Sequence, residues 1–258
     1  MIFNNVTNTL RQWCLDACTA AYDQYAAAQS NDFRIAPSHL SYRTAADLAF
    51  WLGLLTDAEF ADYSEYQSAV RSLLSAEITP QDRELNPVER FHVQKVKTAF
   101  LEKLSSLPPD CVAPDIPYFR ILPENEAQYV KAQLCEIWNC EENSYWYPLS
   151  NVDLRGRDAF FISADVLEPY MDAVQALLGL PQQHVYCLSE SAFARPNCFE
   201  VSEIERYGGT ESIYAAKDFS SVVYCSHEAT VTFAGAIVSA AKKLLAGEKA
   251  HWDHWECP

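Results

Sequence analysis

The stretch Ser221-Val-Val-Tyr-Cys-Ser-His-Glu-Ala-Thr-Val-Thr-Phe233 contains two runs of β-branched and aromatic residues, joined by a short polar connection. Such runs are typical of β-strands, and a short polar connection between them favours a hairpin. We therefore expect strands over 221–225 and 229–233. Further short strands are expected over 145–149, 159–162, 184–188 and 198–201. Helical patterns are found over 125–138, 165–178 and 234–245.

The first hundred residues carry a different pattern, in which apolar residues such as Leu10, Cys14 and Ala21 recur at helical spacing. Helices are expected over 7–28, 42–55 and 57–74, followed by one that opens at Thr79-Pro80, restarts at Pro87 and ends near Leu104. Thr56 is expected to cap the third of these helices. A helical N-terminal half followed by a mixed β-sheet with helices predicts an α+β fold, with the strand directions left open.

Prolines punctuate the sequence between residues 105 and 123, where they exclude a continuous helix. The same segment is rich in apolar residues, so we expect an ordered connector that lies across the surface of one half of the chain. This divides the protein into a helical region over 1–105 and an α+β region over 106–258. A single folded domain that contains both regions is the alternative.

The chain is strongly acidic, with 35 Asp and Glu against 19 Lys and Arg and a net charge of -16. Residues 1–105 carry a net charge of -4 and residues 106–258 a net charge of -12, so the imbalance belongs mainly to the second half. Such a field repels nucleic acid, which we therefore exclude as a partner. Solubility alone and attraction of a basic partner explain the charge equally well.

The cysteine content and the hydropathy of the sequence indicate the cellular compartment of the protein. The nine cysteines are odd in number and irregularly spaced, which does not describe a disulfide framework and favours a reducing compartment. The first residues lack the basic and apolar regions of a secretory signal, and no run of about 18 apolar residues is present. We expect a cytoplasmic protein without a membrane span.

Few motifs point to chemistry. With seven glycines and neither GxxxxGK[ST] nor GxGxxG, the sequence provides no phosphate-binding loop. The tail places His251, His254 and Cys257 at intervals of three, but four zinc ligands are not assembled, so we expect neither a metal nor a cofactor. We also expect no enzymatic activity.

The connection Ser226-His227-Glu228 has two interpretations. His227 follows Cys225 closely, and a Cys/His-dependent hydrolase or transferase is one alternative for the whole chain. Catalytic Cys and His residues usually come from distant segments, however, so we favour a structural turn formed by Ser226, His227 and Glu228. A regulatory protein-binding module is a further alternative that the same composition permits.

The run from Phe219 to Gly235, FSSVVYCSHEATVTFAG, resembles the closing stretch of bacterial immunity proteins from polymorphic-toxin and contact-dependent growth inhibition systems. The segments Tyr145–Leu149 and Glu205–Glu211 are similar to the same family, whereas the first hundred residues show no likeness. The resemblance implies a cytoplasmic protein that binds and neutralises a cognate toxin domain, often a basic nuclease. It also implies that the chain carries no catalytic residues of its own.

Loops often carry binding residues, and one acidic loop stands out around Gly208-Gly209. We expect the carboxylates of Glu203, Glu205 and Glu211 to contact a basic protein partner there. Tyr207 is expected to act as an aromatic anchor in the same interface.

Overall fold

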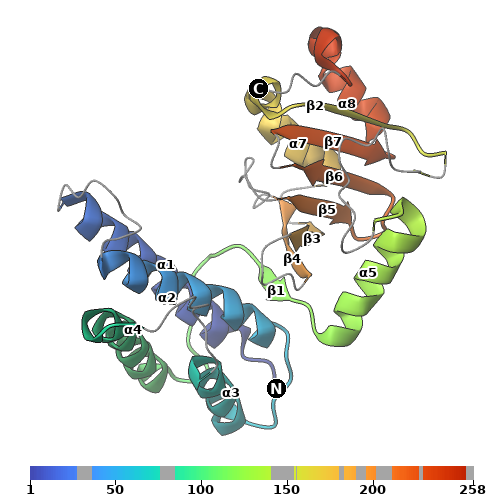
Figure 1. The fold of residues 1–258 in the computed structure, drawn as a ribbon. Helices are drawn as coiled ribbons and strands as arrows, with labels where there is room; N and C mark the ends of the chain where they lie inside the picture. Colours follow the sequence, from blue (N-terminus) through green and yellow to red (C-terminus); the bar gives the residue numbers. More distant parts are fainter. Residues whose placement is uncertain are drawn as a thin grey trace. The chain divides into compact units, whose positions relative to one another are not determined.

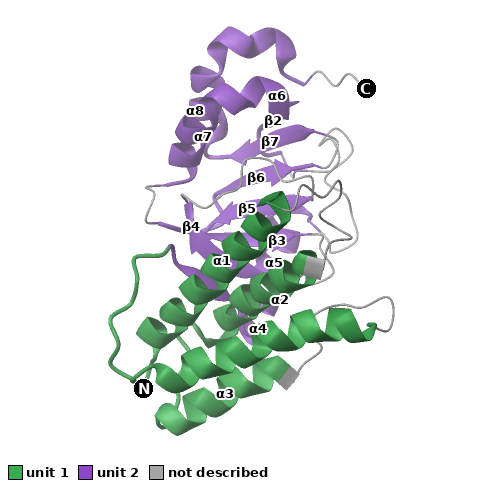
Figure 2. Cartoon of the chain, turned by 90° about the vertical axis from the view of Figure 1, so that its left-hand side faces the viewer, with its two compact units in different colours: residues 1–116 green, residues 117–258 purple. Residues whose placement is uncertain are grey.

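The computed structural model describes residues 1–27, 37–75, 85–140, 154, 156–179, 183–189, 196–201, 211–226 and 229–253. The chain forms two compact units, Met1–Ile116 and Pro117–Pro258 (Figure 2). The boundary between them falls inside the proline-rich connector. The helix start expected at Thr79-Pro80 and the strand expected over 145–149 lie outside the described residues. No helix in the described parts of the chain is long and apolar enough to cross a membrane.

The first unit is helical. It contains α1 (Asn4–Ala27), α2 (Pro37–Trp51), the 3-10 helix η2 (Leu52–Leu55), α3 (Tyr63–Ser75) and α4 (Pro87–Ser106). Apolar side chains from these helices meet in one core that includes Leu10, Cys14, Leu48, Tyr66 and Phe100. The start of α4 follows from its sequence, because Asn86 and Glu89 form a capping box and Pro87 occupies the first turn.

The expected cap at Thr56 is wrong, because α3 begins only at Tyr63. Asp57 adopts a positive φ of 60°, which interrupts a helix at that point. The cap comes instead from Asp62, whose carboxylate accepts a hydrogen bond from the Glu65 backbone N–H at 2.9 Å. Apolar spacing alone does not locate such a turn, because the residues before it have the same periodicity.

The carboxylate of one half-buried residue in this unit gives the protein a pH-dependent stability. Burial raises the pKa of Asp47 on α2 from 3.8 to about 6, although the Arg43 guanidinium lowers it. The folded protein therefore binds this proton more tightly than the unfolded chain does. The contribution of Asp47 to stability is fully present below the ordinary pKa and is lost as the pH rises through about 6.

Asp47→Asn is therefore expected to raise the free energy of unfolding at pH 7 by about 1 kcal/mol, a figure discounted because Asp47 is partly exposed and solvent screens it. Urea unfolding at pH 4 and pH 7 measures the gain, which should be smaller at pH 4. Asp16→Asn, which changes an exposed aspartate on α1, is the control. An equal gain at both pH values would contradict this assignment.

The second unit is built on a seven-stranded sheet in the order β1-β4-β3-β5-β6-β7-β2. Its strands are β1 (Phe119–Ile121), β2 (Ala159–Ser163), β3 (His184–Ser189), β4 (Asn197–Glu200), β5 (Ser212–Ala216), β6 (Ser221–Cys225) and β7 (Thr230–Gly235). The α+β class is confirmed, and so is the hairpin, in which Cys225 pairs with Val231. All the pairings between the described strands are antiparallel, so this part of the sheet is antiparallel rather than mixed. Short connections such as those between β5, β6 and β7 permit only this direction.

Helices cover both faces of the sheet (Figure 1). On one face lies α5 (Glu124–Trp138), and on the other lie α6 (Ala164–Leu167), the 3-10 helix η4 (Glu168–Tyr170), α7 (Met171–Leu178) and α8 (Val238–Leu244). The 3-10 helix η6 (Ala246–His251) follows α8. Successive side chains of β6 point to opposite faces of the sheet, so the strand contributes to the core on both sides. Val223 and Cys225 pack beneath α6 and α7, and Val222 and Tyr224 pack toward α5.

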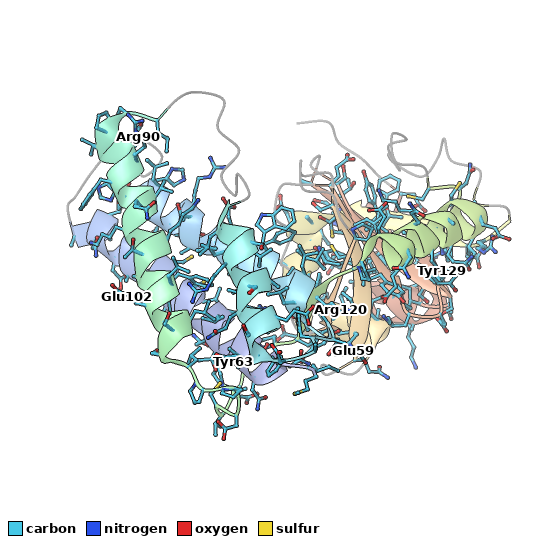
Figure 3. All side chains as sticks on the ribbon, turned by 90° about the horizontal axis from the view of Figure 1, so that it is seen from below. Glu59, Tyr63, Arg90, Glu102, Arg120 and Tyr129 are labelled. Atoms are coloured by element: carbon cyan, nitrogen blue, oxygen red, sulfur yellow. The ribbon has the colours of Figure 1, made fainter. Side chains whose placement is uncertain are left out.

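Two helices in this unit differ from the expectation, and the connector contributes a strand that was not expected. The last helix begins at Val238 rather than Ala234, because residues 234 and 235 continue β7 and Ala234 pairs with Ala159 of β2. The helix expected over 165–178 is divided into α6, η4 and α7 around Pro169, which lacks a backbone N–H. The connector supplies the edge strand β1, whose Arg120 donates two hydrogen bonds of 2.9 Å to Glu126 on α5 (Figure 3).

Candidate functional site

A partly open pocket of about 180 Å³ lies in the second unit, between the α6–α7 segment and strands β6 and β7. The residues that line it come from three separate stretches of sequence. They are Ala164, Asp165, Leu167, Glu168, Met171, Val174, Gln175, Leu178, Val223, Cys225 and Val231. Most of them are apolar, which is the usual character of a site that binds by excluding water.

The helical wall of the pocket follows from residue spacing. Leu167, Met171, Val174 and Leu178 recur at intervals of four, three and four, so they share the face that packs on the sheet. The strand wall comes from alternation, which turns side chains of β6 and β7 toward the same layer. The apolar interior of the pocket is therefore formed by two periodic patterns that meet only in the folded unit.

Two carboxylates lie at the mouth of the pocket. Asp165 and Glu168 line it and are exposed to solvent, one helical turn apart, and Gln175 is half-buried nearby. Among the described residues, no Lys, Arg or His lines the pocket. An apolar interior with a negative mouth suits a ligand that combines an apolar group with a nearby positive charge.

Cys225 lies on the strand wall and was one of the two residues in the alternative catalytic interpretation. Its side chain is buried, and burial raises the pKa of its thiol to about 12. The thiol is therefore protonated at neutral pH, whereas a nucleophilic cysteine needs its thiolate form. His227 lies outside the described residues, so the structure places only one member of that pair.

The expected interface residues are mostly outside the described part of the chain, since Glu203, Glu205 and Tyr207 are not placed. Glu211 precedes β5 and is only 8 % exposed, so it does not lie on an open surface. Within the expected turn, His227 and Glu228 are also not placed. Ser226 is buried, and its backbone N–H donates to the Thr230 carbonyl at 2.9 Å.

The pairing of β5 with β6 brings together polar residues that are distant in the sequence. Ser212 of β5 pairs with Cys225 of β6, and Glu211 and Ser226 are the next residues of the chain beyond this pair. Thr230 and Thr232 of β7 are buried as well. In the sequence, the alternation of threonine with valine and phenylalanine in β7 is a signal for polar residues on this strand as well as for the strand itself.

Potential metal ligands do not gather in the described part of the chain. Within the described ranges, no three His, Cys, Asp or Glu side chains lie close enough to hold a metal ion. Of the three tail residues considered from the sequence, His251 ends η6, while His254 and Cys257 lie outside the described residues. The expectation that the chain holds no metal therefore remains a prediction.

Comparison with protein-family models, with curated proteins and with solved structures found no match to this chain. The resemblance of residues 219–235 to immunity proteins therefore remains a hypothesis. Among the described residues, the pocket is a feature that combines an apolar interior with exposed carboxylates.

Proposed function

We propose that this chain is an immunity protein, which binds a cognate basic toxin domain in the cytoplasm and blocks it. The observation that carries the proposal is the apolar pocket with Asp165 and Glu168 at its mouth. The charge of the second unit supports it, because residues 117–258 contain 20 Asp and Glu against 10 Lys and Arg, a net charge of -10. Both features favour a positively charged protein as the partner.

Binding by this arrangement needs no reaction on the chain itself. Opposite charges speed the encounter of two proteins, and a desolvated apolar anchor then slows their separation. A nuclease that binds a polyanion has a basic cleft, so an acidic protein that covers the cleft also competes with the substrate for the same charges. The buried and protonated Cys225 thiol is consistent with a binding role for the pocket.

Co-expression tests the proposal. The proposal predicts a neighbouring gene for a long secreted protein with a variable C-terminal toxin domain, and that domain alone should stop growth of a bacterial host. Co-expression of this chain is expected to restore growth and to yield a complex on size-exclusion chromatography. The association rate should fall at least about tenfold between roughly 0.05 and 0.5 M salt, because salt screens the attraction.

Reversing the charges at the mouth of the pocket tests whether the toxin binds there. Asp165→Lys/Glu168→Lys should slow association further, whereas the matched control Asp16→Lys/Glu102→Lys reverses two exposed charges in the first unit and should act less. A gene neighbourhood without any toxin gene contradicts the proposal. So does a neighbouring toxin that still stops growth and forms no complex with the unaltered chain.

A further inference from the structure

We infer that the pocket receives a phenylalanine ring of the partner, with a Lys or Arg beside that ring drawn to Asp165 and Glu168. This inference rests on the proposed function, because it specifies the chemistry by which a basic protein would be held. All the residues that line the pocket belong to the second unit.

The pocket has room for one aromatic ring. The pocket measures about 180 Å³, and an apolar cavity of roughly 150 Å³ in another protein admits benzene. One six-membered ring therefore fits, while a second ring does not. Met171 lines the wall, and the polarisable sulfur of methionine makes favourable contacts with aromatic rings.

The apolar interior of the pocket favours phenylalanine over tyrosine and tryptophan. Leu167, Val174 and Val231 surround the space, and the Cys225 thiol, a weak hydrogen-bonding group, is the polar group on its strand wall. A tyrosine hydroxyl or a tryptophan N–H would lose its hydrogen bonds to water and gain little in return. Phenylalanine carries no such group, so it is the aromatic side chain that loses least on entering.

The two carboxylates at the mouth of the pocket favour a positively charged residue of the partner next to the bound ring. Asp165 and Glu168 are three residues apart and both are exposed, so a cation beside the bound ring meets two carboxylates. Exposed ion pairs are individually weak. The ring should therefore supply most of the affinity, and the carboxylates should supply a several-fold preference for a positive over a negative charge.

The chain contains a built-in reporter for this pocket. It has two methionines, of which Met171 lines the pocket and is 7 % exposed, whereas Met1 is 69 % exposed. Isotope-labelled methionine methyl groups give one NMR signal each. Phenethylammonium, which joins a phenyl ring to a cation, is expected to shift the Met171 signal in a saturable way, with a dissociation constant in the millimolar range, and to leave Met1 unchanged.

Two related probes separate the ring from the charge. Phenylacetate has the same ring with a negative charge and should bind at least about threefold more weakly, as expected for loss of an exposed charge interaction. Methylammonium has the cation without a ring or an alkyl chain that could fill the pocket, and it should not shift the Met171 signal at the same concentrations. Equal binding of phenethylammonium and phenylacetate would overturn the role given to the carboxylates.

Variants of the full chain complete the test. Val231→Phe fills the pocket and should weaken phenethylammonium binding at least about tenfold, and Leu178→Phe does the same from the helical wall if the first variant fails to fold. Asp165→Asn/Glu168→Gln should remove the preference for the cation while ring binding persists. The control Asp16→Asn/Glu102→Gln removes two charges from the first unit, where Glu102 lies on α4 (Figure 3), and should preserve that preference.

The outcomes distinguish this inference from the proposed function. If the toxin complex forms but is unaffected by both pocket-filling variants, the pocket assignment fails while the immunity function stands. If the probes behave as expected but no toxin is neutralised, the pocket assignment stands and the immunity function fails. A Met171 signal that phenethylammonium does not move overturns the inference directly.

Discussion

Gly235→Ala is expected to lower the free energy of unfolding by about 3 kcal/mol, which combines the cost of overpacking with that of a strained backbone. Gly235 ends β7 with a φ of +85°. A Cβ atom there would lie 2.3 Å from the Ser220 carbonyl oxygen and 2.6 Å from the Trp138 ring. The carbonyl belongs to the backbone and cannot move aside without disturbing the turn before β6. Urea unfolding followed by circular dichroism measures the loss.

Gly247→Ala is the matched control for this change. Gly247 lies in η6, and an added Cβ would meet nothing within 4 Å. Its replacement should change stability by less than about 0.5 kcal/mol, as at an ordinary surface position. If the two substitutions cost the same, the close approach of Gly235 to Ser220 and Trp138 is not what constrains this residue.

Trp138→Ala is expected to cost about 3–5 kcal/mol, the range for deletion of a large buried aromatic side chain. Trp138 closes α5 against the sheet and is among the largest fully buried side chains. Its indole N–H donates a hydrogen bond of 3.0 Å to the Phe219 carbonyl. Phe219 itself has a φ of 57°, so this bond holds a backbone conformation that non-glycine residues seldom adopt.

Two further substitutions separate the contributions of Trp138. Trp138→Phe retains most of the apolar contact but leaves the Phe219 carbonyl without its indole donor, so it should cost about 1–2 kcal/mol. Tyr129→Ala changes an exposed aromatic residue on the same helix, which is 55 % exposed (Figure 3), and should cost less than about 1 kcal/mol. If Trp138→Ala were as mild as Tyr129→Ala, α5 would not depend on this anchor. Denaturant unfolding of all three variants makes the comparison.

The carboxylates and apolar residues of the pocket were visible in the sequence, but the pocket was not. Leu167 and Met171 belong to a segment expected to be helical, and Val223 and Val231 to the expected hairpin. Neither the helical periodicity nor the strand pattern predicts that the helix and the hairpin pack against each other. The acidic loop around Gly208-Gly209 is recognisable in the sequence because its carboxylates are close together along the chain. Asp165 and Glu168 indicate a binding site only because the folded unit places them beside an apolar pocket.

Local patterns in the sequence alone determined the helical first half, the β6–β7 hairpin and hence the α+β class. Periodicity and capping act between residues a few positions apart, so they can be read along the chain. Tertiary structure decided the rest: β1 and β5, the antiparallel order of the sheet and the meeting of α7 with β6 and β7. These features depend on pairing between distant segments, whose free energy comes from burial and backbone hydrogen bonds that no single segment contains.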